Sequence, residues 1–358
     1  MAYTGTGTQA DPAIPGTYDS ATQTYDGKIA DLLEIFSDCT AGNVGGNTSG
    51  SYYVKLCNNI ECSTDENYDG FISDFLDLSR VIKFYSDDNK FIRGLTSKNN
   101  NCFIKMKQSS DDVYPPDPST CLIENISFLD CIYKPLRAPS DALLSAQLFR
   151  GFGKLKSVTW SMICYPQQGG YYQSKVYQVN IGSLSVLWNY GSYNQYYGPC
   201  MEGCSFYIKY IGDVNSYADN GNRTQTSHYI SYSDYTCMNN VFIIDGATVL
   251  QGYGIQLQNT NSYNSFIFNN CKFMYSPVIM LNGGTNNYIA VLNPNIDSNL
   301  TKPISLTGSG NSYSIFAADT SVYDVDIVKG TDVANSIYYA TLSELSDENY
   351  LMSINFIP

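Results

Sequence analysis

One short pattern, repeated along the chain, constrains the fold more than any other feature of the sequence. It reads apolar, any residue, Asn or a small polar residue, apolar, any residue, apolar or aromatic, as in "FNNCKF" at 268–273. Copies begin at residues 123, 155, 201, 238, 268 and 291, and a weaker copy begins at residue 322. Because alternate residues of a strand face opposite sides, each copy predicts a short strand with one buried face. Irregular spacing between copies indicates similar units separated by insertions.

These repeats favour an all-β fold, a right-handed parallel β-helix (solenoid). Its turns take about 22 to 25 residues and pair with the next turn about 4.8 Å away. Asn and Gly tolerate the left-handed backbone of a tight bend, and stacked Asn side chains can form a hydrogen-bonded ladder. We expect one structural ladder, formed by Asn125, Asn240, Asn270 and Asn293, with Cys271 and Phe273 filling the interior. The alternative is a β-sandwich, but Asn-Gly and Asp-Gly hairpin signals between alternating runs are few.

Composition and charge narrow the class of protein. The chain has 32 Tyr, 16 Phe and 28 Gly but only 15% charged residues, against about 25% in typical domains, which favours strands and loops. Its formal charge of -13 would repel a phosphate backbone, so nucleic acid is not expected as a partner. We find no long apolar run and no export signal at the start, so neither membrane insertion nor export is expected.

The cysteines and the histidine argue against a zinc site. The 11 cysteines include no CxxC pair, and His228 is the single histidine. Zinc sites need closely spaced ligand pairs of these residues. We therefore interpret the cysteines as small core residues of a protein made in a reducing cytoplasm.

The pattern divides the chain into three parts. Residues 1–49 form an N-terminal segment that includes "YDGKIADLLEIFSDC" at 25–39, whose apolar residues Ile29, Leu32, Leu33 and Phe36 predict a short capping helix. Residues 50–335 form the β-helix, with its first strands at 50–62 and long loop excursions near 86–120 and 165–200. Residues 336–358 form a C-terminal cap or interaction segment.

Candidate catalytic and metal sites are weak. Asp65, Asn67 and Asp69 match the first positions of a calcium loop, but Leu76 stands where a bidentate carboxylate is needed. The carboxylates Asp130 and Asp245 fall in copies of the repeat too far apart for a glycosidase pair. We expect no cofactor beyond this weak candidate calcium site and no convincing catalytic constellation.

An aromatic segment is the best candidate for binding. "WNYGSYNQYYGPC" places Trp188, Tyr190, Tyr193, Tyr196 and Tyr197 among Gly, Ser and Asn. Adhesive loops use this mixture because Tyr offers large contact area at low entropic cost. A sugar or a protein could stack there, and the tyrosines could equally be ordinary strand residues or fill a trimer interface.

Several segments resemble virion proteins of tailed bacteriophages, especially crAss-like and other gut phages, of the tailspike and head-fibre type. The resemblance rests on "YTGTGTQADPAIPGTY", "YDGKIADLLEIF", "YYVKLCNNIEC" and "TLSELSDENYLMSINFIP". It implies a β-helix protein of the virion, synthesised in the bacterial host cytoplasm and assembled as a homotrimer. It also implies attachment to capsid, portal or tail proteins, and no catalytic motif is carried over.

Two functions follow from these expectations. The first is a structural spike, fibre or decoration protein on the particle surface that contacts a host glycan or protein. The second is a polysaccharide-degrading tailspike depolymerase, a glycoside hydrolase or lyase of the same architecture.

Overall fold

The described residues of the protein are mostly strands in parallel sheets. The computed structural model describes residues 3–65, 76–97, 102–106, 121–133, 146–150, 153–164, 179–180, 184–189, 192–197, 200–210, 237–246, 248–249, 262–273, 279–292, 295–296, 304–309, 312–317, 328–329 and 335–339. Within these ranges there is one α-helix and one short 3-10 helix, Cys62–Thr64. The prediction of an all-β chain built from parallel sheets is therefore confirmed.

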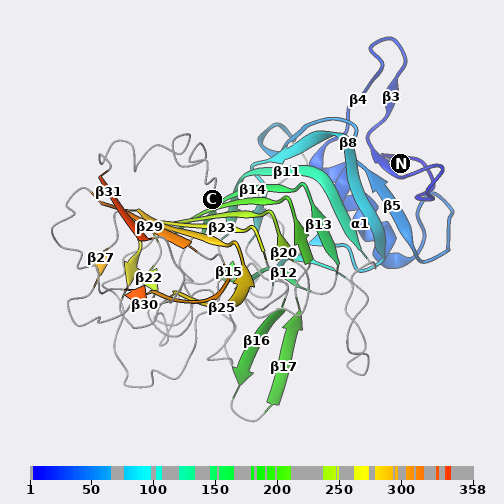
Figure 1. Cartoon of the computed structure of the whole chain (residues 1–358). Helices are drawn as coiled ribbons and strands as arrows, with labels where there is room; N and C mark the ends of the chain where they lie inside the picture. Colours follow the sequence, from blue (N-terminus) through cyan, green and yellow to red (C-terminus); the bar gives the residue numbers. More distant parts are fainter. Residues whose placement is uncertain are drawn as a thin grey trace, which may run out of the picture.

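A 15-stranded sheet forms the body of the molecule. Its strands are β5 (Tyr52–Lys55), β6 (Ile60–Glu61), β8 (Val81–Arg93), β9 (Thr96–Ser97), β11 (Leu122–Tyr133), β13 (Lys154–Lys156), β14 (Thr159–Cys164), β18 (Cys200–Glu202), β19 (Ser205–Tyr210), β20 (Cys237–Met238), β21 (Val241–Asp245), β23 (Ser265–Asn269), β26 (Tyr288–Leu292), β29 (Ser312–Ala317) and β31 (Asn335–Tyr339). From β11 through β14 to β31 the strands lie side by side in chain order (Figure 1). Order along the sequence is thus order along the stack.

Three smaller parallel sheets accompany this body. One contains β7 (Leu76–Asp77), β10 (Cys102–Lys105), β12 (Ala146–Arg150) and β15 (Val179–Asn180). The second contains β22 (Thr248–Val249), β24 (Lys272–Phe273) and β27 (Asn295–Ile296), and the third contains β25 (Ile279–Thr285), β28 (Ile304–Ser309) and β30 (Val328–Lys329). Several repeats therefore contribute strands to more than one sheet.

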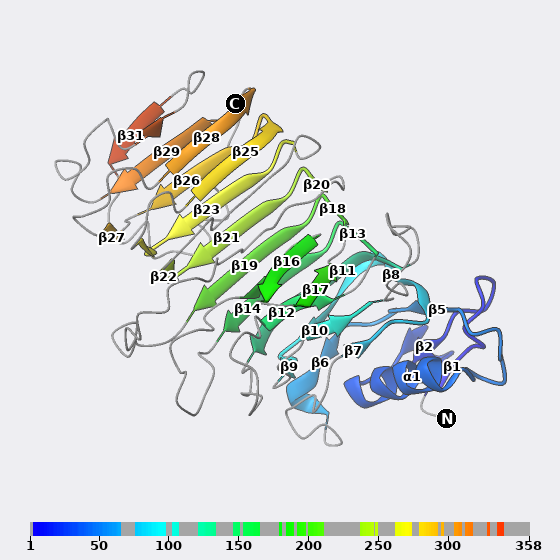
Figure 2. The same cartoon turned by 90° about the horizontal axis from the view of Figure 1, so that it is seen from below.

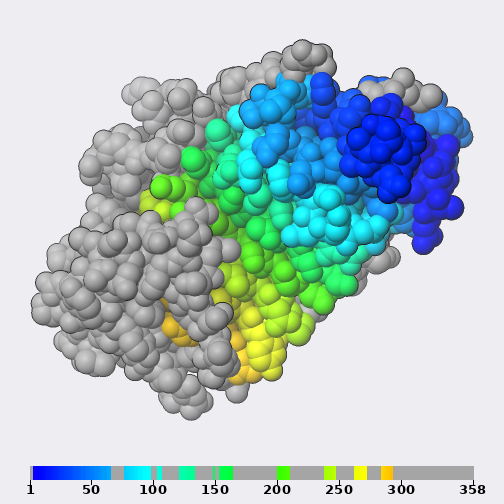
Figure 3. Space-filling model, turned by 90° about the horizontal axis from the view of Figure 1, so that it is seen from above, coloured from blue at the N-terminus to red at the C-terminus, as the bar shows by residue number. Residues whose placement is uncertain are grey.

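Register pairing defines the length of each repeat. Hydrogen-bonded equivalents are 36 residues apart between Cys204 and Asn240, 24 between Asn240 and Asn264, and 23 between Asn264 and Asn287. The two shorter values agree with the expected turn length, and the longer one contains an insertion. In Figure 3 the coloured residues follow one another in sequence order across the visible face, from blue at the N-terminal segment through green to yellow.

The predicted copies of the pattern do not share one register. Ile123, Leu155 and Met201 are register partners as expected, but Met201 pairs with Cys237, and Met238 pairs with Glu202. Phe268 pairs with Ile244 and Val291, so the copies at 268 and 291 belong to the opposite end of the strand. The copy at 322 lies outside the described residues. One short pattern therefore described two different bends.

A row of large apolar side chains fills the interior of the stack. Phe128 stacks on Trp160 with ring centroids 4.3 Å apart, and Phe242 stacks on Phe206 at 5.3 Å and on Phe266 at 5.2 Å. Buried aromatic pairs of this kind stabilise beyond the area that they bury. The row continues in register through Ile289. Cys271 is fully buried as predicted, while the side chain of Phe273 lies outside the described set.

The outer face of the sheet changes along the stack. In the first repeats it carries charged residues such as Lys83, Glu124 and Lys156. In β21, β23 and β26 the outward residues form a second buried apolar cluster that includes Ile243, Ile267 and Leu292. These strands are apolar on both faces, which is the pattern of a sheet covered on both sides.

The N-terminal segment packs against the first strands. Helix α1 (Ile29–Ala41) lies at the N-terminal end of the stack (Figure 2) and buries Ile29, Leu32 and Phe36, as its apolar spacing predicts. The Phe36 ring meets Phe84 of β8 edge-on at 5.4 Å. Gly42, at φ 83°, ends the helix in a left-handed conformation that glycine adopts without strain.

Short hairpins precede the helix. β1 (Tyr3–Thr4) pairs with β2 (Ile14–Pro15), and β3 (Tyr18–Asp19) pairs with β4 (Thr24–Tyr25), both antiparallel. Ala13 adds a parallel bridge to Val54 of β5, so the N-terminal segment extends the edge of the main sheet. Within the part of the chain that the structure describes, no helix is long and apolar enough to span a membrane.

Parts of both expected loop excursions belong to strands. Residues 86–97 and 102–106 belong largely to β8, β9 and β10, and residues 98–101 and 107–120 of the first excursion lie outside the described residues. In the second, β15 pairs with β12 inside the stack, whereas β16 (Leu184–Asn189) and β17 (Ser192–Tyr197) form a separate antiparallel hairpin. Polar, aromatic sequence therefore occurs both inside and outside the stack.

Candidate interaction surface

In six successive repeats of the described chain, from β11 to β26, a single residue with positive φ turns the chain at one end of the main strands. The φ values lie between 51° and 62°, the left-handed region that Asn and Gly tolerate best. In order along the stack, these residues are Asn125, Ser157, Gly203, Asn239, Tyr263 and Asn286. We call this set the corner column.

The four asparagines expected in one ladder do not occupy equivalent positions. Asn125 belongs to the corner column, whereas Asn240 follows Asn239 and is buried. Asn270, with φ 50°, lies after the opposite end of β23, and Asn293 falls outside the described residues. The prediction placed two bends in one register, because both carry Asn next to alternating apolar residues.

The structure nevertheless contains a buried asparagine ladder, formed by Asn240, Asn264 and Asn287. Asn264 Oδ1 accepts from the backbone N–H of Asn240 at 3.2 Å and from its side-chain amide at 2.9 Å. Asn287 Oδ1 accepts from the same two groups of Asn264 at 3.1 and 3.0 Å. Buried polar groups are costly unless paired, so the ladder fixes the register of three consecutive repeats.

Sequence reasoning missed Asn264 and Asn287, although a signal for them exists. Each lies directly before a strand, in "NSFIF" and "NYIAV", at spacings of 24 and 23 residues from its predecessor. Aligning the strands that follow the bend, rather than the bend itself, would have aligned these residues. The aromatic and aliphatic strand residues carry the stronger periodic signal.

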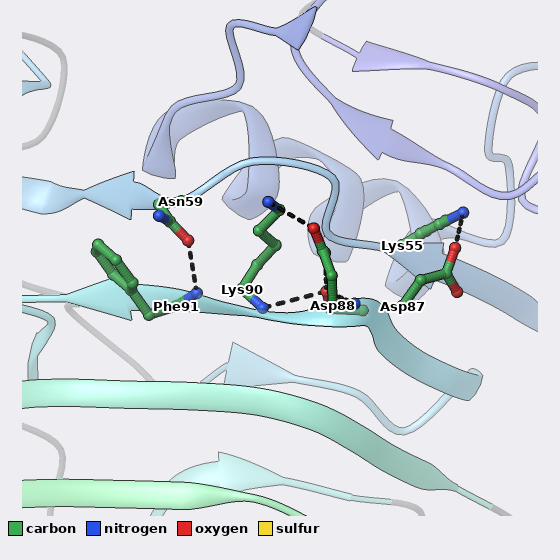
Figure 4. Close-up of polar contacts among 7 residues, drawn as sticks. Lys55, Asn59, Asp87, Asp88, Lys90 and Phe91 are labelled. Atoms are coloured by element: carbon green, nitrogen blue, oxygen red, sulfur yellow. Dashed lines mark hydrogen bonds and ion pairs between the residues drawn. The ribbon is translucent and has the colours of Figure 1, made fainter.

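In β8 the corner is part of a wider turn, in which Asn89, with φ 57°, stands at the register of Asn125. Ser86 Oγ accepts from the backbone N–H groups of Asp88 and Lys90 at 3.3 and 3.1 Å, which closes the loop. Lys90 pairs with Asp88 at 2.7 Å, and Asp87 pairs with Lys55 of the preceding repeat at 2.5 Å (Figure 4). Asn59 Oδ1 also accepts from the backbone N–H of Phe91 at 3.1 Å. The charged residues of this turn are therefore paired, either with each other or with Lys55 of the preceding strand.

A charged strip crosses the outer face of the first repeats. Glu124 lies between Lys83, at 2.7 Å, and Lys156, at 3.1 Å, and hydrogen bonds from these two lysines hold its pKa below the usual value of 4.5. Lys154 pairs with Glu202 in the same way. Opposite charges on adjacent strands stabilise pairing. The charged strip therefore supports the register of the first repeats, which precede the asparagine ladder.

The aromatic segment forms the β16–β17 hairpin. Trp188 is the register partner of Tyr193, while Tyr196 faces Ser185 and Tyr197 faces Leu184 across the pair. Tyr190 lies outside the described residues. The hairpin extends away from the stacked sheets (Figure 1), so four of the five predicted binding residues share one projecting element.

Asp65, the first residue of the candidate calcium loop, contacts the helix. It is buried, and its Oδ2 accepts from the backbone N–H of Ala30 at 2.8 Å in the first turn of α1. A carboxylate there satisfies an unpaired helix donor and complements the helix dipole. Asn67 and Asp69 lie outside the described residues. Across the described ranges, no group of three His, Cys, Asp or Glu side chains is placed to hold a metal ion.

The carboxylates Asp130 and Asp245 lie apart. Asp130 is exposed and pairs with Arg93 Nε at 3.2 Å. Asp245 is buried and accepts from the Tyr207 hydroxyl and the Asn269 amide, each at 3.0 Å. Strands β14 and β19 separate their strands β11 and β21, about 14 Å at ordinary strand spacing. This separation is too large for the two carboxylates of a glycosidase, as expected. The single histidine, His228, lies outside the described residues.

All but one of the cysteines whose side chains the structure describes are buried, and Cys57 is half-buried. Cys39, Cys121 and Cys204 are free and buried. Burial raises the pKa of Cys121 to about 12 and that of Cys204 to about 11, so these thiols stay protonated and unreactive near neutral pH. The structure agrees with the prediction for these residues; the side chain of Cys237 is not among those described.

No family model matches the chain, and no curated protein is significantly similar to it.

Proposed function

We propose that the stacked strands wind into a right-handed parallel β-helix, one repeat per turn. In-register pairing of β19, β21, β23, β26 and β29 supports this proposal. Spacings of 24 and 23 residues between ladder asparagines match one turn of about 22 to 25 residues. The aromatic row along the interior is the core that such a winding requires.

We further propose that the chain is a surface-exposed structural component of a bacteriophage particle, a spike, fibre or decoration protein attached to capsid or tail. The observation that carries this proposal is a stack whose register is fixed by a buried asparagine ladder, with a tyrosine-rich hairpin extending from its side. A rigid support that presents an aromatic loop suits adhesion. The resemblance of the terminal segments to phage virion proteins supports the same function.

Locating the protein on intact virions tests this proposal. Antibodies raised against the purified chain should label a defined site on particles in electron micrographs, and protease digests of purified virions should contain its peptides. Finding the chain only in the lysate and never on purified particles would overturn the proposal. The assembly is proposed to be a homotrimer, so light scattering should give three times the 39.7 kDa chain mass.

The proposed contact with the host is the β16–β17 hairpin. Replacing residues 184–197 with a short Gly-Ser linker should leave circular dichroism and the melting temperature nearly unchanged, because the hairpin forms a sheet of its own. Binding of the purified protein to host cells should be lost. A matched replacement of residues 18–25, the β3–β4 hairpin, should leave cell binding intact.

The alternative function is a polysaccharide depolymerase. Incubating the protein with host capsular polysaccharide and measuring new reducing ends or unsaturated sugars separates the two functions. The structural proposal predicts no turnover. Turnover that disappears in Asp245→Asn or Asp130→Asn would establish the enzyme instead.

A further inference from the structure

Tyr263 is the unusual member of the corner column. The other five members are Asn, Ser or Gly, whereas Tyr263 holds φ at 57° with an aromatic side chain. A bulky residue in this region is an outlier, because its Cβ crowds the backbone. Such strain persists where the surrounding structure imposes it, and it often marks a functional position.

The Tyr263 side chain is also 52% exposed, and only Tyr18, at 51%, is comparably exposed among the large hydrophobic residues that the structure describes. It therefore contributes little to the core. An Asn or Gly would make the same turn with less strain, so core packing does not explain the tyrosine. A role at the protein surface would explain why a tyrosine stands at this position.

Two exposed asparagines flank this tyrosine. Asn239 precedes it in the column and Asn286 follows it, each exposed and each one strand spacing away, about 4.8 Å. Parallel bridges from Ser262 to Met238 and to Thr285 fix this alignment. The three residues, here named the corner row, are exposed and uncharged, with Tyr263 between Asn239 and Asn286 in register.

We propose that the corner row binds a neutral carbohydrate, with a pyranose ring stacked on Tyr263 and its hydroxyl groups hydrogen-bonded to Asn239 and Asn286. The C–H groups on one face of a pyranose are apolar and complement the electron-rich face of an aromatic ring. Amides supply both donors and acceptors for hydroxyl groups. A protein partner needs a larger apolar centre than one tyrosine, and the absence of charge in the row favours a neutral sugar over an anionic one.

The proposal of a sugar site rests on the proposed function, because that function places the corner row on an exposed particle surface. Sugar binding itself is measured on the isolated protein. Labelling of virions and sugar binding can therefore fail independently. A negative result on virions overturns the particle assignment and leaves the corner row to be judged by binding alone.

Affinity electrophoresis in native gels tests the corner row. The probes are dextran, mannan and galactan as neutral polysaccharides, and alginate as an anionic one. The full chain should be retarded by at least one neutral polysaccharide. Tyr263→Asn should lose that retardation, and the double variant Asn239→Gly, Asn286→Gly, which keeps the left-handed turns, should reduce it. Tyr18→Asn is the matched control and should be retarded like the wild type.

Stability separates a binding role from a structural one. Tyr263→Asn relieves backbone strain, so its melting temperature should equal or exceed that of the wild type. Three results would overturn the proposal: retardation by alginate alone or by no polysaccharide, equal retardation of Tyr263→Asn, or a clear fall in its melting temperature.

Discussion

Two neighbouring residues at the corner of each repeat perform different tasks. The first adopts positive φ and is exposed in Asn239 and Asn286, whereas the second is buried and forms the ladder in Asn240 and Asn287. The sequence predicts that asparagines lie at bends, and the structure agrees. The sequence alone could not separate the two tasks. A shift of one residue exchanges the inner and outer faces of a strand, and the letters "NN" do not show which asparagine faces inward.

Replacing the central ladder residue should destabilise the protein. Asn264→Ala removes the acceptor of two hydrogen bonds from Asn240 and the side-chain amide donor to Asn287 Oδ1, while the backbone N–H of residue 264 still donates to that oxygen. Each buried polar group that loses its partner costs about 1 to 3 kcal/mol. The free energy of unfolding, measured by chemical denaturation, should therefore fall by at least about 2 kcal/mol.

The control for this change is Asn286→Gly, which alters an exposed corner residue with φ 53°. Glycine tolerates this backbone, so the change in unfolding free energy should stay within about 0.5 kcal/mol. Equal effects of the two substitutions would contradict the distinction between corner and ladder.

Trp160 gives a second prediction at the residue scale. Its ring stacks on Phe128 in the interior, and its Nε1–H has no acceptor among the described residues. Trp160→Phe keeps an aromatic ring and removes an unpaired donor, so it should cost less than about 1.5 kcal/mol. Trp160→Ala should cost about 3 to 5 kcal/mol by leaving a cavity. Denaturation curves with equal midpoints for the two variants would contradict this packing.

At the scale of elements, the helix was the most predictable part of the chain. Four apolar residues at helical spacing predict α1, and its face packs on the first strands as expected. The partner at its N-terminus could not be predicted, because Asp65 is 35 residues from Ala30 in sequence. The calcium-like spacing around Asp65 led instead to a metal hypothesis.

Removing the Asp65 carboxylate should weaken the start of α1. Asp65→Ala should lower the unfolding free energy by about 0.5 to 2 kcal/mol, the usual range for a lost helix cap. Asp65→Asn retains an oxygen acceptor and should cost less. Thermal melts in EDTA should show the same order of stability. If calcium stabilised the wild type but neither variant, Asp65 would be a metal ligand as well.

The charged strip predicts how stability depends on pH. Lys83 and Lys156 lower the folded pKa of Glu124 below 4.5, so its contribution is complete above pH 4.5 and is lost as pH falls through the folded pKa. Glu124→Gln should therefore show a shallower loss of stability below pH 4.5. The control Glu34→Gln, on the exposed side of α1, should follow the wild type. An identical acid profile for Glu124→Gln would contradict the pairing.

At the scale of the whole molecule, the repeat established parallel strands but not their full number or path. Strands such as β25 and β28 contain Gly, Ser and Thr and carry little periodic signal, so only pairing with neighbours reveals them. The first part of the excursion predicted at 86–120 was wrong for the same reason: "SDDN" at 86–89 resembles a loop, yet it is a short turn within β8. Long-range pairing outweighs local propensity at such positions.

The central claim is that successive repeats stack in register around a buried asparagine ladder. An experimental structure of the purified full-length protein, at a resolution that shows side chains, tests it most directly. The account predicts Asn240, Asn264 and Asn287 on adjacent parallel strands about 4.8 Å apart, with their amides hydrogen-bonded in series. Antiparallel hairpins at these residues, or asparagines facing solvent, would contradict it.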